Sequence, residues 1–177
     1  MKVGIIGCGA IANIITTSIV QEENNIDIAY FFDKDIERAE NLASLAGGVA
    51  VLDFDDMLND VDLILECAAP VSVKEYAPKV LGHGIDMIVM SIGALMDFDF
   101  YHELESIRDD YFKRGIAITF ILGTHVELKR KTYHAVSKSD IKGASKFINF
   151  ADSVILIGKS CFENSILVKI ENNRNGY

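Results

Sequence analysis

Residues 2–12 have the sequence KVGIIGCGAIA, and a helix-like segment follows them. The apolar run at the start predicts a strand, and Gly7, Gly9 and Ala12 then have the G-x-G-x-x-G/A spacing. Gly7 allows a tight turn off the strand, Gly9 lets the backbone approach a pyrophosphate, and Ala12 lets the helix pack closely on the strand. The helix would direct its N-terminal N–H groups toward the phosphates, so this stretch predicts a dinucleotide-binding crevice.

A second strand-like run, residues 27–32, ends at Asp33. An acidic side chain there can accept hydrogen bonds from the hydroxyls of an adenosine ribose. Because a carboxylate would repel a 2′-phosphate, Asp33 favours NAD over NADP. Lys34 and Arg38 could instead offer charge to a 2′-phosphate, although Arg38 also fits a solvated helix face, so the cofactor is NAD or NADP. The alternative to this interpretation is an ordinary glycine turn in an α/β sheet.

Strand-like and helix-like segments alternate regularly over residues 1–122. Runs such as residues 63–65 and 87–90 are apolar on both faces, which is typical of a parallel sheet covered by helices on both sides. The pattern predicts an α/β fold with a doubly wound parallel Rossmann sheet. The expected strands are residues 3–6, 27–32, 48–51, 62–66, 87–91 and 117–122, and the expected helices are residues 10–21, 36–46, 54–58, 71–81 and 98–113.

Several single residues predict where helices begin and end. Asp35 and Asp97 are expected to cap the helices that follow them. Gly47 and Gly115 are expected to end helices. Pro78 lies inside a helix-like run and is expected to kink that helix or split it in two.

The alternation fails after residue 122, so residues 123–177 are expected to form a short, incomplete second α+β lobe. Residues 126–136 and 165–170 predict strands, whereas the period of residues 148–157 fits a strand or a helix. A polar tail is expected over residues 172–177. So short a lobe would lean on the first domain or pair with a second chain.

Ligands of an open α/β sheet lie outside the carboxyl ends of its strands. Ala68 and Ala69 are expected there, where they would let a ribose and a nicotinamide lie against the backbone. Plain packing of a helix on a strand would also explain these two alanines. The predicted cofactor-binding residues are Gly7, Gly9, Ala10, Ile11, Asp33, Lys34, Ala68, Ala69, Ser91 and Gly93.

Composition excludes several classes of function. The chain has 177 residues, 50% of them hydrophobic, and a net charge of −9, which would repel a nucleic acid. No apolar run approaches the roughly 20 residues that span a bilayer, and the chain opens into a strand rather than a signal peptide. We therefore expect a cytoplasmic protein with a small-molecule substrate and no membrane or nucleic-acid partner.

The cysteines and histidines predict no metal site. Cys8, Cys67 and Cys161 are odd in number and fit no zinc spacing, so buried thiols are favoured over catalytic ones. The four histidines form no pair at helical spacing.

Several segments of the chain resemble the archaeal-type L-aspartate dehydrogenases. The most specific are EYAPKVL at residues 75–81 and MIVMSIGAL at residues 87–95, and the resemblance covers residues 1–125. It implies an NAD(P)-dependent oxidoreductase that removes hydride from the α-carbon of L-aspartate and leaves iminoaspartate and ammonia. It also implies a homodimer, with cofactor roles at the glycine turn, Asp33, Ala68, Ala69 and Ser91.

The chain departs from that family beyond residue 120. Ile121-Leu122-Gly123-Thr124 stands where the family has a Pro-Ser-Gly-Ala turn followed by a helix, and Tyr177 stands where its active-site histidine would align. The catalytic residues therefore stay unknown. The candidates are His125, which also fits a plain loop histidine, and Lys129, Arg130 and Lys131, which also fit a solvated strand edge. The alternative function is a catalytically impaired dinucleotide-binding protein or a truncated homologue.

Overall fold

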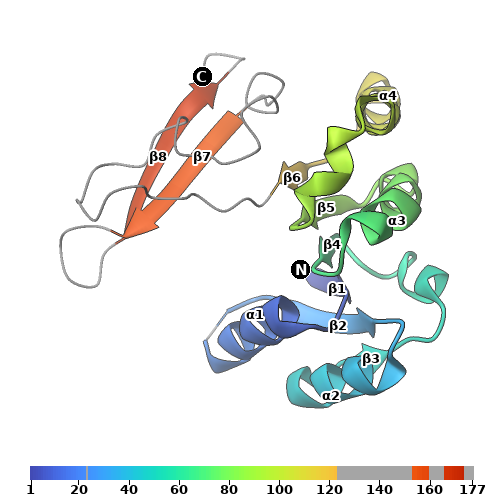
Figure 1. Ribbon diagram of the computed structural model, residues 1–177, viewed down its shortest axis with the longest axis vertical. Coiled ribbons are helices and arrows are strands. Elements are labelled where there is room, and N and C mark those ends of the chain that lie inside the picture. The colour runs from blue at the N-terminus through green and yellow to red at the C-terminus, as the bar shows by residue number, and fades with distance from the viewer. Residues whose placement is uncertain (23, 123–152, 160–165, 174–177) are drawn as a thin grey trace. The chain divides into compact units, whose positions relative to one another are not determined.

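The computed structural model describes residues 1–22, 24–122, 153–159 and 166–173 (Figure 1). By its contacts the chain divides into two compact units, Met1–Gly123 and Thr124–Tyr177. Among the helices of the described segments, none is long and apolar enough to cross a membrane.

The first unit is built on a six-stranded sheet with the order β3-β2-β1-β4-β5-β6, in which every neighbouring pair is parallel (Figure 1). The chain builds outward from β1 to β3 and then returns to the other side of β1 to place β4. This reversal is the topological switch point of a doubly wound sheet, so the predicted Rossmann fold is confirmed. The strands are β1 (Lys2–Ile6), β2 (Asp27–Phe32), β3 (Val49–Ala50), β4 (Leu63–Glu66), β5 (Asp86–Val89) and β6 (Phe120–Leu122).

The helices connect the strands in chain order. Their bounds are α1 (Ala10–Gln21), α2 (Ile36–Ala46), α3 (Pro70–Gly82) and α4 (Phe98–Lys113), with the 3₁₀ helices η1 (Phe54–Met57) and η2 (Ile92–Met96) between them. Helices α1, α2 and α4 have the predicted bounds, whereas the strands from β3 onward are shorter than predicted. Helix η2 was not predicted, because a single short turn leaves no readable period.

The core lies on both faces of β1. Ile5, Phe31 and Ala12 are fully buried in a cluster that α1 and α2 form with β1 and β2. Helix α3 buries Val73 and Val80 completely. Each large aliphatic side chain withdrawn from water contributes about 1.5–3 kcal/mol, so β1, apolar on both faces, is fixed at the centre of the sheet.

The helix caps differ from expectation at one position. The Asp97 carboxylate accepts a hydrogen bond from the N–H of Phe100 at 3.3 Å, so its predicted cap is confirmed. Asp35 occupies the N-cap of α2, but its side chain makes no capping bond, and that prediction is wrong. Its carboxylate pairs instead with the Arg38 guanidinium, at 3.1 Å from Nε. At the C-terminus of α2, Gly47 adopts φ +74° and ends the helix as predicted.

Pro78 does not split its helix. Helix α3 runs unbroken from Pro70 to Gly82 with Pro78 inside it. Proline removes one backbone donor, but Val73 and Tyr76 before it and Val80 after it are all buried. Packing of both halves against one core therefore outweighs the missing hydrogen bond.

The second unit contains an antiparallel pair of strands, β7 (Ser153–Lys159) and β8 (Ile166–Asn173). Strand β8 confirms the strand expected at residues 165–170 but runs three residues further, so the predicted polar tail is wrong at residues 172–173. Strand β7 resolves the ambiguous period of residues 148–157 in favour of a strand where the structure describes it. The strand expected at residues 126–136 lies outside the described residues.

Two cysteine thiols lie in the core of the first unit, as the sequence favours. Cys8 and Cys67 are both buried. Burial raises the pKa of each thiol to about 12, and the nearby Asp33 carboxylate adds to the effect at Cys8. Both groups are therefore protonated at neutral pH, and a thiol is a far weaker nucleophile than a thiolate.

We expect iodoacetamide at neutral pH to leave Cys8 and Cys67 unmodified in the folded chain. The same reagent should label both in denaturant, where their pKa returns to the ordinary value. Peptide mass spectrometry of the two samples measures this directly. Rapid labelling of either cysteine in the folded chain would contradict the burial described here.

Candidate functional site

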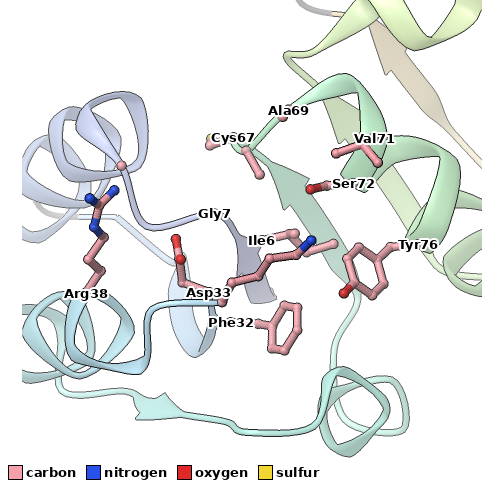
Figure 2. Close-up of a pocket in the computed structure, with 13 residues that line it drawn as sticks. Ile6, Gly7, Phe32, Asp33, Arg38, Cys67, Ala69, Val71, Ser72 and Tyr76 are labelled. Carbon is pink, nitrogen blue, oxygen red and sulfur yellow. The ribbon is translucent and has the colours of Figure 1, made fainter.

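A cavity of about 300 Å³ opens at the carboxyl ends of β1, β2 and β4, at the switch point of the sheet. Of the predicted cofactor residues, the structure brings together Gly7, Gly9, Asp33, Lys34, Ala68 and Ala69 in its lining. Figure 2 shows the Asp33 carboxylate pointing toward the Gly7 turn. The other lining residues are Ile6, Phe32, Arg38, Cys67, Val71, Ser72 and Tyr76.

Gly7 forms the turn for which the motif requires a glycine. Its φ is +86°, a conformation that other residues rarely adopt, and a Cβ there would lie 2.5 Å from the Cβ of Ala68. Its N–H donates to the carbonyl of Phe32 at 2.8 Å. The turn is thus held against the loop after β4 on one side and the end of β2 on the other.

Gly9 fulfils a different requirement. Its backbone is extended, at φ −83° and ψ −160°, and a Cβ built on it would meet nothing within 4 Å. It is the N-cap of α1, and no side chain caps that helix. Open space therefore adjoins a helix N-terminus that has no side-chain acceptor, which is the arrangement that fits a diphosphate.

Ala10 and Ile11 do not line the cavity with their side chains. They form the first turn of α1, and the Ile11 side chain is exposed. The motif predicts a role for their backbone N–H groups, which depends on where the helix begins rather than on the direction of the side chains.

Asp33 is held in a fixed orientation by two backbone N–H groups. Its Oδ2 accepts from the N–H of Cys8 at 2.6 Å, and its Oδ1 accepts from the N–H of Asp35 at 2.9 Å. Two carboxylate oxygens offer about four acceptor positions, so the group keeps capacity for further donors. One side chain thus joins the glycine loop to the end of β2 and still faces the cavity.

Two cations lie near this carboxylate. Lys34 and Arg38 both line the cavity, and Arg38 is already paired with Asp35. This pairing, on an exposed helix face, offsets part of the positive charge that Arg38 could offer to a 2′-phosphate.

The apolar wall of the cavity was not predicted. The ring of Tyr76 lies 5.4 Å from that of Phe32 and 4.5 Å from that of Phe54, centroid to centroid. Burial raises the pKa of Tyr76 to about 12, and a hydrogen bond with Glu75 adds to the effect, so the phenol is neutral at neutral pH. The only sequence signal that could have indicated this wall is an aromatic residue at a core position of the helix after β4.

Ser91 and Gly93 are not in the lining of the cavity. Ser91 follows β5 as the N-cap of η2, and Gly93 lies within η2, where it approaches Pro70 at the start of α3. The loops that follow β4 and β5 are joined through Glu66, a fully buried carboxylate that the sequence analysis missed. The sequence signal that could have identified Glu66 is an acidic residue at the end of the strand 63–66, directly after three apolar residues.

The catalytic candidates His125, Lys129, Arg130 and Lys131, together with Tyr177, lie outside the described residues. Within the described part of the chain, no three potential metal-ligating side chains lie together.

Comparison with known proteins gives relatives that match somewhat less than two thirds of the chain. The chain is 49% identical over 112 residues to an L-aspartate dehydrogenase of Methanothermobacter thermautotrophicus, a match that covers 62% of this chain and 44% of that protein. It is 34% identical over 109 residues to the L-aspartate dehydrogenase of Methanocaldococcus jannaschii, with 60% and 41% covered. The predicted resemblance is therefore confirmed, and the matched part of the chain spans less than half the length of these relatives.

Solved structures share the fold. An apo scyllo-inositol dehydrogenase from Lactobacillus casei superposes with a TM-score of 0.60 at 19% identity, covering 70% of this chain and 36% of that one. The WlbA dehydrogenase from Chromobacterium violaceum, in complex with NADH and UDP-GlcNAcA, gives a TM-score of 0.59 at 13% identity, with 70% and 34% covered.

One family model matches residues 7–110, which include the glycine turn, Asp33, Glu66 and the loop after β5. Its description is the NAD-binding domain of homoserine dehydrogenase. Because this match extends over more than half of the chain, the protein belongs to that family of NAD-binding domains.

Proposed function

We propose that the cavity at the switch point holds the adenosine and diphosphate of NAD or NADP, and that the chain is an NAD(P)-dependent oxidoreductase that acts on L-aspartate. The observation that carries the proposal is the open space at Gly9 beside the uncapped N-terminus of α1. The family match and the fixed carboxylate of Asp33 support it independently.

Each part of the coenzyme has residues that suit it. The N–H groups of Gly9, Ala10 and Ile11 would donate to the diphosphate, and Asp33 would accept from the ribose. Lys34 would lie beside the ribose and offset negative charge. The apolar wall that Val71 and Tyr76 help to form would take the adenine.

The nicotinamide half would lie toward Ala68, Ala69, Ser91 and Gly93. These small residues leave room for a flat ring against the backbone. When bound, the coenzyme supplies the hydride acceptor, and the protein must position the substrate and move a proton.

The substrate proposal rests on the names of the relatives and on the resemblance at residues 75–95. A dicarboxylate substrate needs cations and an acid–base group. His125 and the three basic residues at positions 129–131 stay the candidates for these roles. We also propose that the protein is a homodimer located in the cytoplasm. This part of the proposal rests only on the resemblance to the L-aspartate dehydrogenases.

NADH fluorescence titration of the purified chain, followed by an assay of NAD⁺ reduction with L-aspartate, tests the function as a whole. We expect saturable binding of the coenzyme and aspartate-dependent formation of NADH. Binding without turnover at any pH would reject the dehydrogenase and leave the alternative, a dinucleotide-binding protein. Absence of binding would reject both.

Alanine substitutions at Gly9 and at Gly7 should affect different properties: the first mainly weakens coenzyme binding, and the second mainly lowers the stability of the fold. Gly9→Ala should lower the free energy of unfolding by only about 1 kcal/mol, the usual loss when alanine replaces glycine at an N-cap, because its Cβ meets nothing. It should weaken NADH binding about tenfold or more by occupying the diphosphate space. Gly7→Ala should lower the free energy of unfolding by roughly 2–4 kcal/mol through strain and the clash with Ala68. Thermal melts and titrations of both variants measure the contrast. Wild-type affinity in Gly9→Ala would contradict a diphosphate at this position.

Replacing the Asp33 carboxylate should change the preference between coenzymes. Asp33→Ser should weaken NADH about tenfold, through loss of a charge-assisted hydrogen bond, and weaken NADPH less, because repulsion of the 2′-phosphate is lost as well. Glu37→Ser, an exposed acidic residue of α2 outside the cavity, is the control for net charge and should alter neither affinity. Equal losses for both coenzymes in Asp33→Ser would show that Asp33 is purely structural.

A further inference from the structure

Glu66, the last residue of β4, is the only charged side chain that is buried among the residues the structure describes. Both of its carboxylate oxygens are used. Oε1 accepts from the N–H of Ala68 at 2.8 Å, and Oε2 accepts from the N–H of Ser91 at 3.0 Å. Its backbone carbonyl also accepts from the N–H of Met90 at 3.1 Å.

These bonds join two loops that are distant in sequence. Ala68 belongs to the loop after β4 and lines the cavity, whereas Ser91 follows β5 and is the N-cap of η2. Ala68 is also the residue packed against the Gly7 turn. One buried side chain therefore sets the position of both loops relative to the glycine turn.

A carboxylate is a poor choice for stability alone, because an apolar side chain could fill the same space without loss of solvation. It is, however, the side-chain group that offers two acceptor oxygens and no donor. Two backbone N–H groups from separate loops require this group. Glutamine could satisfy only one of them and would turn an amide N–H toward the other.

We propose that Glu66 is a positioning residue that fixes the loops after β4 and β5 where the nicotinamide half of the coenzyme binds. The proposal rests on the proposed coenzyme function. Glu66 acts through Ala68 and Ser91, because its own side chain is fully buried and is not part of the cavity lining. Ala68 lines the cavity proposed for the adenosine and diphosphate, whereas Ser91 does not, so the effect should be larger on the nicotinamide half than on the adenosine half, which also depends on Gly9 and Asp33.

The test compares two ligands on the full chain with Glu66→Gln. NADH carries the nicotinamide, and ADP-ribose carries only the adenosine, the diphosphate and the second ribose. Loss of one charge-assisted hydrogen bond should weaken NADH about tenfold and ADP-ribose less, by about threefold or below, because ADP-ribose does not reach the loop at Ser91 with a nicotinamide. Amide hydrogen exchange should accelerate at Ala68 or Ser91, the two donors that Glu66 holds.

Asp86→Asn is the matched control. The Asp86 carboxylate, at the start of β5, accepts from the N–H of Thr119 at 2.7 Å, so the same chemical change removes the charge from a similar bond at the amino ends of the strands, away from the cavity. Both affinities should stay at the wild-type value in this variant. If Glu66→Gln gives no folded protein, Glu66→Asp replaces it in the test, because aspartate keeps both oxygens but is one methylene shorter. The same difference between the losses of affinity for NADH and for ADP-ribose is then expected.

An unchanged affinity for NADH in a folded Glu66 variant would overturn the inference. So would an equal loss for NADH and ADP-ribose, which is the result of a general structural role. Both results presuppose a wild-type chain that binds NADH, so they leave the proposed function standing. Failure of the wild-type chain to bind NADH would reject the proposed function itself.

Discussion

The close approach of the Gly7 turn to Ala68 is the constraint on which the rest of the site depends. A side chain at Gly7 would lie 2.5 Å from the Ala68 side chain, and the backbone there needs a positive φ. Only glycine meets both demands. Because the chain leaves β1 in this tight turn, α1 begins at Ala10, and its N-cap Gly9 lies in the lining of the cavity.

Two carboxylates stabilise this arrangement from opposite sides of β1. Asp33, after β2, accepts from the N–H of Cys8, and Glu66, at the end of β4, accepts from the N–H of Ala68. Asp33 remains accessible to a ligand in the cavity, whereas Glu66 is fully buried. The same type of interaction, a carboxylate that accepts from backbone N–H groups, thus holds both loops, and both loops meet the glycine turn.

Much of the fold could be predicted from the sequence, because apolar runs and glycine spacing are local signals. The bounds of α1 and α2 and the positions of Gly7 and Asp33 beside the cavity follow from such signals. The errors have two different causes. Asp35 makes a local ion pair with Arg38, three residues along the chain, instead of a capping bond, and non-local packing against the core holds α3 together across Pro78. Tyr76 and Glu66 were missed because their roles depend on partners in other loops and strands, which no pattern within one segment contains.

An amide NMR titration of the chain with NADH tests most directly whether the N-terminus of α1 binds the diphosphate of the coenzyme. We predict saturable shifts at Gly9, Ala10 and Ile11, whose N–H groups would donate to the diphosphate, while the amides of Asp62 and Asp86, at the amino ends of β4 and β5, stay unchanged. Saturable binding that leaves the amides of Gly9, Ala10 and Ile11 unmoved would contradict this prediction.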